Sequence, residues 1–495
     1  LYIFFMVARI VKEPKAKTST SKLPPGPRNL PVIGNLHQLL GSQPHRTLRD
    51  LAKKYGPLMH LQVGQVSTIV ISSPEMAKKL LKYHDIHFAN RPSILGTMIL
   101  FYNNSDIIFS QYGNYWRQLR KICTMELLGA NRVKFFRSVR EEETSNLIKS
   151  ISSYVGLTVN ISERIFSATY GITSRAAFGK KCNDRDQEEF ISVVKEAIKL
   201  LTGFFVADAY PSIKLLETIT GLGPKVEKLF KKSDAILQKI VNEHRGRQGE
   251  AEADLVDVLL KLQQEDSLEF RLTDENIKAI IFVRLLTMHW QSRLLKILFN
   301  SKLYMVSNKV EWALSEMMKH PQVMKKAQEE VRQVFYGKTV DETRIHELKF
   351  LKSIIKETLR LHPALPLFGR ECRETCEIDG YKIPIKTRVI VNTWAIERDP
   401  RYWTEAETFH PERFINSLTD YKGTYFQFIP FGVGRRICPG ISFALPNIEL
   451  ALAQILYHFD WKLPNGIESR DLDMCEQFSI SMKRKKDLFL VPIAY

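Results

Sequence analysis

Cys438 stands in a stretch, FGVGRRICPG from Phe431 to Gly440, whose residue types could hold a metal cofactor. Its three glycines permit a tight turn and a close approach of another group to the backbone. Arg435 and Arg436 place positive charge beside the cysteine, which favours the thiolate form. A thiolate held in a loop just before a helix is a suitable axial ligand for haem iron, where it donates electron density that promotes O–O cleavage. The alternative is an ordinary buried cysteine in a glycine-rich turn.

Two further pairs have a spacing that brings side chains together on a helix. Glu357 and Arg360 in ETLR are three residues apart, and Trp116 and Arg120 in WRQLRK are four apart. Both spacings place the two side chains on one helical face. Taken alone, the first pair could be a solvated ion pair, and the second a buried tryptophan beside a surface arginine.

The elements that must position these residues are mostly helical. LMHLQVG and STIVISS, which ends at Ser73, alternate as strands of a hairpin do, and the segment from Pro74 has helical periodicity. A helix also follows the Cys438 loop. Further charged amphipathic segments predict helices near 140–150, 186–201, 224–245 and 321–335. Strand patterns return around 376–391 and near the C-terminus. The fold class is therefore mainly α with small β sheets.

Composition favours one large domain with reduced thiols. The chain has 495 residues, 44% of them hydrophobic, and no Ser/Gly-rich linker or internal repeat interrupts it after about residue 40. Its six cysteines are scattered, which suits a cytosol-facing protein better than a disulfide framework. Cys372 and Cys376 are four apart, but no second pair supports a zinc site. The net charge of +18 attracts anionic partners, although no motif of a nucleic-acid binder is present.

The N-terminus indicates a membrane. The apolar run from Leu1 to Ala8 is far shorter than the roughly 20 residues that span a bilayer. Lysines follow directly, as expected on the cytoplasmic side of a membrane helix, and a proline-rich stretch from Pro24 to Pro27 then forms a stiff hinge. We interpret residues 1–22 as the remnant of a truncated membrane anchor with a basic linker. A plain disordered leader is the alternative.

The loop around Cys438 resembles the haem-binding signature of the cytochrome P-450 superfamily, F-x-x-G-x-R-x-C-x-G. The residues that fill its fixed positions are Phe431, Gly434, Arg436, Cys438 and Gly440. The resemblance covers essentially the whole chain. It implies the cytochrome P-450 fold, a single large haem domain over residues 23–495, haem b as cofactor, and Cys438 as the axial ligand of the haem iron.

The same resemblance implies roles for other residues. Glu357 and Arg360, with Arg413 of PERF, correspond to a Glu-Arg-Arg triad that braces the haem loop. Trp116 and Arg120 correspond to residues that face the haem propionates. Arg370 in LPLFGRE corresponds to a further propionate donor, although Gly369 stands before it where many relatives have proline.

The closest likeness is to the plant A-type branch, through LRLHPALPL, VNTWAIERDP and GISFALPNIELALAQILYHFDWKLPNG. Members of that branch are bound to the endoplasmic reticulum with the catalytic domain facing the cytosol. They take electrons from NADPH through a reductase and oxidise hydrophobic small molecules, with terpenoids favoured here. By family position the substrate pocket draws on four mostly apolar ranges: 91–106, 200–205, 364–368 and 477–479.

One segment departs from the family. Between Ile281 and Glu311, relatives have about fifteen residues containing A-G-T-D-T, whereas this chain has 29, from Phe282 to Val310, an excess of roughly four helical turns. The usual acid and alcohol residues that deliver protons to oxygen are absent, so no catalytic residue is assigned. An altered reading frame, a retained intron or a mis-predicted exon would explain the segment, and a functional insertion is the alternative.

Three functions follow from these patterns. The first is a haem-thiolate monooxygenase. The second is an oxygen-independent haem-thiolate isomerase or dehydratase, and the third is a non-catalytic haem binder or pseudogene product. Turnover that depends on a reductase separates the first from the other two.

Overall fold

The computed structural model describes most of the chain: residues 23–39, 41, 43–178, 193, 196–197, 200, 206–246, 254–265, 270–288, 305–478 and 481–495. The proposed anchor remnant at 1–22, most of the predicted helix at 186–201 and the segment 289–304 lie outside the described residues. Within those ranges, no helix combines the length and the apolar character that crossing a membrane requires.

Helices make up most of the described chain. Their bounds are α2 (Leu36–Leu39), α3 (Pro44–Tyr55), α4 (Pro74–Lys78), α5 (Leu95–Leu100), α6 (Asn114–Ile122), α7 (Ala130–Phe135), α8 (Arg137–Ser152), α9 (Ile161–Phe178), α11 (Val206–Ala209), α12 (Leu215–Ile219), α13 (Leu222–Arg245), α14 (Leu255–Gln264), α15 (Asp274–Met288), α16 (Met305–Lys319), α17 (Pro321–Val334), α18 (Lys349–Leu361), α19 (Thr393–Ile396) and α20 (Ile441–His458).

The strands are short and form four small sheets. Their bounds are β1 (Leu58–Val63), β2 (Val66–Ile71), β3 (Val159–Asn160), β4 (Leu367–Glu371), β5 (Cys376–Ile378), β6 (Tyr381–Ile383), β7 (Arg388–Asn392), β8 (Phe459–Lys462), β9 (Glu476–Gln477), β10 (Lys483–Arg484) and β11 (Phe489–Ala494). The largest sheet has the order β1-β2-β7-β4, in which β2 and β7 are parallel and the other pairs antiparallel. The predicted hairpin is thus β1 and β2.

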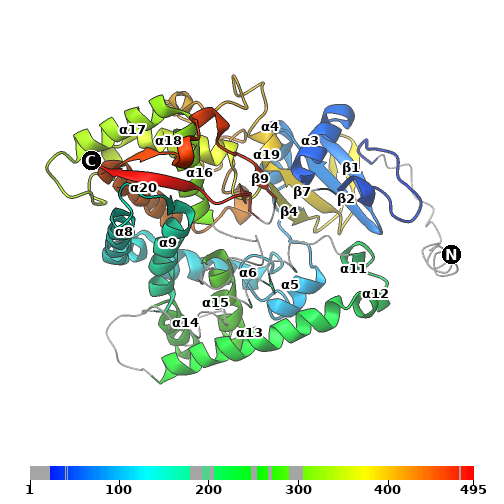
Figure 1. The fold of residues 1–495 in the computed structure, drawn as a ribbon. Coiled ribbons are helices and arrows are strands. Elements are labelled where there is room, and N and C mark those ends of the chain that lie inside the picture. Colours follow the sequence, from blue (N-terminus) through cyan, green and yellow to red (C-terminus); the bar gives the residue numbers. More distant parts are fainter. Residues whose placement is uncertain are drawn as a thin grey trace.

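Among the described residues, the larger apolar cores are two formed by helices and two that include strands of the largest sheet. In Figure 1, α8, α9, α17 and α20 lie on one side, the largest sheet with α3 and α4 on the other, and the long helix α13 runs below with α14 and α15. Helix α20 packs against α16, α17 and α8, so the segment that follows Cys438 lies in the centre of the larger helical core. This burial fixes the end of the Cys438 loop.

Local capping explains where several elements begin. Ser73 precedes Pro74 and accepts a hydrogen bond from the N–H of Met76 at 3.3 Å, which starts α4 as a Ser N-cap with proline at the first position does. The periodicity from Pro74 continues past α4 as a π-helical turn, Lys79–Tyr83.

The secondary structure agrees with the expected mainly α class, but the sequence patterns missed β3 and β4.

A buried histidine joins the end of α13 to the start of α14. Nδ1 of His244 lies 2.8 Å from the carbonyl oxygen of Ile240, and Nε2 lies 2.9 Å from Oδ2 of Asp254, the N-cap of α14. Both partners are acceptors, so the doubly protonated ring fits this arrangement. Burial lowers the pKa of His244, but the hydrogen bond and charge of Asp254, with the carbonyl of Ile240 and the charge of Asp257, raise it overall.

This pair makes stability depend on pH. A raised pKa in the folded state gives a stabilisation that is fully present below the ordinary histidine pKa of about 6.5 and is lost as pH rises through the folded pKa. We expect the thermal unfolding midpoint of His244→Asn to lie below that of the wild type at about pH 6, and the gap to narrow towards about pH 9. His37→Asn, at an exposed position, is the control. A gap that stays constant over this range would contradict the prediction.

Candidate functional site: a thiolate loop and an arginine-lined cavity

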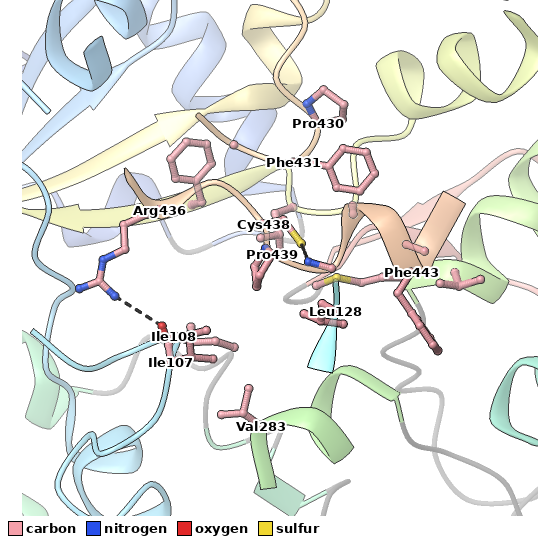
Figure 2. Close-up of a pocket in the computed structure, with 18 of the residues that line it drawn as sticks. Ile107, Ile108, Leu128, Val283, Pro430, Phe431, Arg436, Cys438, Pro439 and Phe443 are labelled. Carbon is pink, nitrogen blue, oxygen red and sulfur yellow. Dashed lines mark hydrogen bonds between the residues drawn. The ribbon is translucent and has the colours of Figure 1, made fainter. Parts of the chain in front are cut away.

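The Cys438 loop is held by its own backbone and by the sheet side of the molecule. The N–H of Cys438 donates to the carbonyl oxygen of Phe431 at 2.9 Å, and Sγ of Cys438 accepts from the N–H of Gly440 at 3.4 Å (Figure 2). Gly434 has a φ of 72°, and a Cβ there would lie 2.7 Å from the carbonyl oxygen of Leu81. The turn therefore requires glycine at this position.

The surroundings favour a thiolate at Cys438. The residue lies directly before the first turn of α20, an 18-residue helix whose N-terminal end carries a partial positive charge. Arg120 faces the same region: burial lowers its pKa, while the charges of Cys438 and Cys123 act in the opposite direction. Arg435, which the sequence places beside the cysteine, turns away and binds Oδ2 of Asp85 through Nη1 at 2.9 Å.

Glu357, Arg360 and Arg413 lie together as one network. Arg360 donates to Glu357 through Nε at 2.7 Å and Nη2 at 2.8 Å, and Nε of Arg413 donates to Oε1 of Glu357 at 3.0 Å. The side chains of Glu357 and Arg360 are 0% exposed. The network is therefore a buried one, whereas a solvated helical pair would be exposed.

A second set of hydrogen bonds connects this network to the Cys438 loop. Nη1 of Arg360 donates to the carbonyl oxygens of Glu397 at 2.9 Å and Ala406 at 2.7 Å. Oε1 of Glu397 in turn accepts from the N–H of Ile429, two residues before the loop begins, at 2.9 Å. Helix α18 thus fixes the backbone that leads into the thiolate loop.

Cys438 lines a cavity of about 310 Å³. Figure 2 shows Val283 of α15 and the neighbouring Ile107 and Ile108 across from the loop. Most of the wall is apolar, and the apolar residues include Ile107, Ile108, Leu128, Phe166, Leu255, Ile280, Val283, Met305, Val306, Leu359, Ala364, Leu365, Phe368, Phe431, Phe443 and Ile448. The cavity suits a hydrophobic occupant.

Four arginines line the same cavity: Arg91, Arg120, Arg370 and Arg436. Burial lowers the pKa of Arg436 to about 9 and that of Arg91 to about 10, and burial with the charges of Arg91 and Arg436 lowers the pKa of Arg370 well below its ordinary value. Nη2 of Arg370 donates to the carbonyl oxygen of Val433 at 3.1 Å, but its Nε and Nη1 are buried without a partner among the described residues. The charges of Asp85 and Asp106 act on this cluster, but among the described residues four guanidiniums outnumber these two carboxylates.

Arg436 and Trp116 donate hydrogen bonds to backbone carbonyl oxygens, mostly in the loop between α5 and α6. Arg436 donates to the carbonyl oxygens of Ala89 at 2.8 Å, Ser110 at 2.5 Å and Ile107 at 3.5 Å, the last of which Figure 2 shows. The indole N–H of Trp116 donates to the same Ile107 oxygen at 3.0 Å. Both side chains still line the cavity, and they also tie this loop to the thiolate loop.

The residues fit a haem. Iron protoporphyrin combines an iron that takes a thiolate ligand, a flat apolar ring and two carboxylates. Cys438 would supply the thiolate, and the cavity wall would supply the apolar surface. The unpartnered N–H groups of Arg370, beside Arg91 and Arg120, would donate hydrogen bonds to the two carboxylates.

Replacing Arg370 should therefore change stability in opposite directions with and without haem. In haem-free protein, Arg370→Met removes a buried charge that lies among other arginines and has unpartnered N–H groups, so the unfolding midpoint should rise. In haem-loaded protein it removes donors to carboxylate, each worth about 1.5–3 kcal/mol, so haem should transfer to apomyoglobin at least about 10-fold faster. The exposed Arg373→Met is the control. Unchanged haem transfer in Arg370→Met would rule out the donor role.

The cavity agrees with the predicted pocket ranges only in part. From those ranges it takes Arg91, Ala364, Leu365 and Phe368, and it adds Ile107 and Ile108 just beyond the first range. In the predicted range 477–479, the ring of Phe478 stacks on that of His45 at a centroid distance of 5.5 Å. Residues 201–205 and 479 lie outside the described residues. Sequence reasoning placed Arg91 in the substrate pocket and missed it as a member of the arginine cluster.

Known proteins match this chain over nearly its whole length. The profile of the family described as Cytochrome P450 matches residues 24–286 and 305–491. The chain is 53% identical to "Cytochrome P450 71D10" of Glycine max over 100% of this chain and 96% of that protein. It is 52% identical to "Tabersonine 6,7-epoxidase isoform 1" of Catharanthus roseus, over 99% of this chain and 95% of that protein. It is 48% identical to "Premnaspirodiene oxygenase" of Hyoscyamus muticus, over 100% of this chain and 97% of that protein.

Solved structures share the fold. The chain superposes on a zebra fish cytochrome P450 determined with progesterone with a TM-score of 0.76 at 21% identity, over 91% of this chain and 99% of that one. A zebra fish cytochrome P450 determined with abiraterone gives a TM-score of 0.73 at 22% identity, over 91% and 100%.

Proposed function

The chain belongs to the cytochrome P450 family, and on that premise we propose that it is a haem-thiolate monooxygenase that oxidises a hydrophobic plant metabolite. The predicted family and fold are confirmed, and the family makes the protein an oxidoreductase. Relatives named as an epoxidase, a hydroxylase and an oxygenase favour oxygen insertion over the isomerase, dehydratase and non-catalytic alternatives.

The observation that carries the proposal is the thiolate loop of Cys438 at the wall of an apolar cavity. When bound, haem supplies the chemistry by which RH, O₂, two electrons and two protons give ROH and water. The residues of this chain would bind and orient: Cys438 would ligate the iron, Arg370 with Arg91 and Arg120 would hold the carboxylates, and the apolar wall would exclude water from the substrate.

The finer parts of the proposal concern substrate, electron donor and location. A terpenoid-like hydrophobic substrate is supported by the apolar wall and by the relative named for premnaspirodiene, while the tabersonine relatives extend the range to test. We place the protein at the endoplasmic reticulum membrane with NADPH as electron source through a reductase. The net charge of +18 supports association with an acidic partner or an anionic lipid surface.

The long segment between Phe282 and Val310 bears directly on activity. The family profile breaks between residues 286 and 305, inside this segment. Helix α15 ends at Met288, and α16 begins at Met305 and contributes Met305, Val306, Ser307 and Lys309 to the cavity wall. Because the segment carries several charged side chains, we expect part of it to leave the apolar core as a loop or an extra helix. Residues 289–304 lie outside the described ranges, so this remains a prediction.

A segment exchange tests the function. The chain is compared with a version in which Phe282 to Val310 is replaced by a family segment of about fifteen residues that contains A-G-T-D-T. Both are assayed with reductase and NADPH on a panel that includes premnaspirodiene and tabersonine. We expect more product per NADPH from the repaired version, because positioned proton donors govern oxygen cleavage.

Two outcomes would contradict these claims. Equal product per NADPH in the two proteins would show that the segment does not impair oxygen activation. If neither haem-loaded protein oxidised any member of the panel in a reductase-dependent way, the monooxygenase assignment itself would fail. Sequencing the transcript across the codons from Ile281 to Glu311 would show whether the segment is translated as given.

A further inference from the structure

Lys309 of α16 is a buried amine in the wall of the cavity. It is 2% exposed and lines the same cavity as Cys438, together with Val306 and Ser307 of the same helix. The proposed function gives this side chain no role. A lysine fully removed from solvent beside an apolar cavity therefore needs an account of its own.

A hydrogen bond to a backbone carbonyl oxygen holds the amine in place. Nζ of Lys309 donates a hydrogen bond to the carbonyl oxygen of His362, the residue that ends α18. His362 is itself fixed, because its ring stacks on Trp312 at a centroid distance of 3.8 Å and its Nε2 lies 2.7 Å from Oε1 of Glu316. The amine thus has a defined position.

A lysine ammonium has three N–H donors. Water cannot freely reach the amine of Lys309, because the side chain is buried. Burial lowers the pKa of Lys309 to about 7, although the charges of Glu397 and Glu476 act in the opposite direction. A substantial share of the side chain is then a neutral amine with a lone pair at neutral pH. A lysine desolvated in this way is the form that attacks carbonyl carbons.

We propose that Lys309 is a covalent capture site for hydrophobic aldehydes and ketones that enter the cavity. The amine nitrogen adds to the carbonyl carbon, the oxygen leaves as water, and a Schiff base joins the ligand to Nζ: R–CHO and Lys–NH₂ give R–CH=N–Lys and H₂O. The step involves no oxidation or reduction, so it needs neither oxygen nor NADPH, and it stands apart from the monooxygenase activity.

A lysine that only caps the end of α18 would behave differently. Capping needs a hydrogen-bond donor at Nζ, which both the charged and the neutral form supply. Arginine would supply it too, but arginine forms no imine with a simple aldehyde. The two roles therefore separate in Lys309→Arg, which keeps a donor towards His362 and loses the nucleophile.

Trapping the imine tests the proposal. Haem-loaded protein without reductase is mixed with decanal and sodium cyanoborohydride, which reduces the imine to a stable secondary amine, and modified lysines are found by peptide mass spectrometry. We expect Lys309 to be alkylated at pH 7 at least about 10-fold faster than the exposed Lys319 of the same helix, since exposed lysines are in general protonated at that pH. The rate at Lys309 should rise with pH and level off above about 8.

Three comparisons complete the design. Decanol, which fills the cavity without a carbonyl, should slow alkylation of Lys309 and leave that of Lys319 unchanged. Glyceraldehyde, a polar aldehyde, should show no preference for Lys309. Lys309→Arg and Lys309→Met, checked for their haem spectra, should carry no adduct at this position and keep the adducts at exposed lysines.

The measurement on the wild-type protein tests the proposal even if both variants fail to bind haem. Alkylation of exposed lysines without an adduct at Lys309 would overturn the proposal. An adduct at Lys309 that decanol does not slow would overturn the claim that capture occurs from the cavity. Because no reductase is present, neither result depends on whether the protein is an active monooxygenase.

Discussion

Replacing Cys438 by serine is expected to abolish the Soret band that thiolate-ligated haem gives when the reduced protein binds carbon monoxide. The hydroxyl of serine is not a thiolate donor, and the loop offers Sγ of Cys438 at the cavity wall directly before α20. Product formation with reductase and NADPH should fall to background in the same variant. The measurement is the difference spectrum of reduced protein with and without carbon monoxide.

Cys123→Ser is the matched control for this experiment. Cys123 is also a buried cysteine that lines the cavity, but it stands outside the loop signature. It should keep the thiolate band. Persistence of the band in Cys438→Ser, or its loss in Cys123→Ser instead, would show that the axial ligand has been misassigned.

Removing Glu357 is expected to leave little haem-loaded protein. Glu357→Ala leaves the buried guanidinium of Arg360 without this carboxylate and removes the same carboxylate from Arg413. Breaking a buried charge network in this way lowers the free energy of unfolding by about 3 to 5 kcal/mol. The segment that Arg360 holds leads through Glu397 and Ile429 into the thiolate loop. The measurements are the haem content per polypeptide and the unfolding midpoint.

Glu347→Ala provides a control with the same spacing and geometry. Glu347 and Arg344 are also three residues apart and form two hydrogen bonds of 2.8 Å, but their side chains are 37% and 31% exposed. A surface pair of this kind contributes little to stability, because solvent screens its charges. Normal haem content in Glu357→Ala, or an equal loss in Glu347→Ala, would contradict the bracing role.

Spacing in the sequence was informative where the partners lie on one helix or in one loop. Glu357 and Arg360 share a helical face by their spacing alone, and α18 places them as that spacing requires. Their burial was not visible, since it depends on α18 packing against the segment around Arg413. A solvated pair and a buried triad have the same local pattern.

The arginine cluster shows the limit of local patterns. Arg370 was placed by resemblance to the family, but Arg91 was not recognised as its neighbour, because the contact of Arg91 with the backbone at Gly369 joins residues 278 positions apart. The buried pair of His244 and Asp254 was missed as well, although they are ten residues apart, since the relative position of two helices decides whether they meet.

The sequence by itself determined the fold class, the family, and the chemical identity of the thiolate loop, because helical periodicity and the spacing of Phe431, Gly434, Arg436, Cys438 and Gly440 are properties of short stretches of chain. Only the tertiary structure decided which charges face the cavity and which are buried. Arg435 turns to Asp85, Arg370 keeps N–H groups without a partner among the described residues, and Lys309 meets the end of α18. These outcomes depend on packing between distant segments, where desolvation and the supply of partners set the energy of each charge.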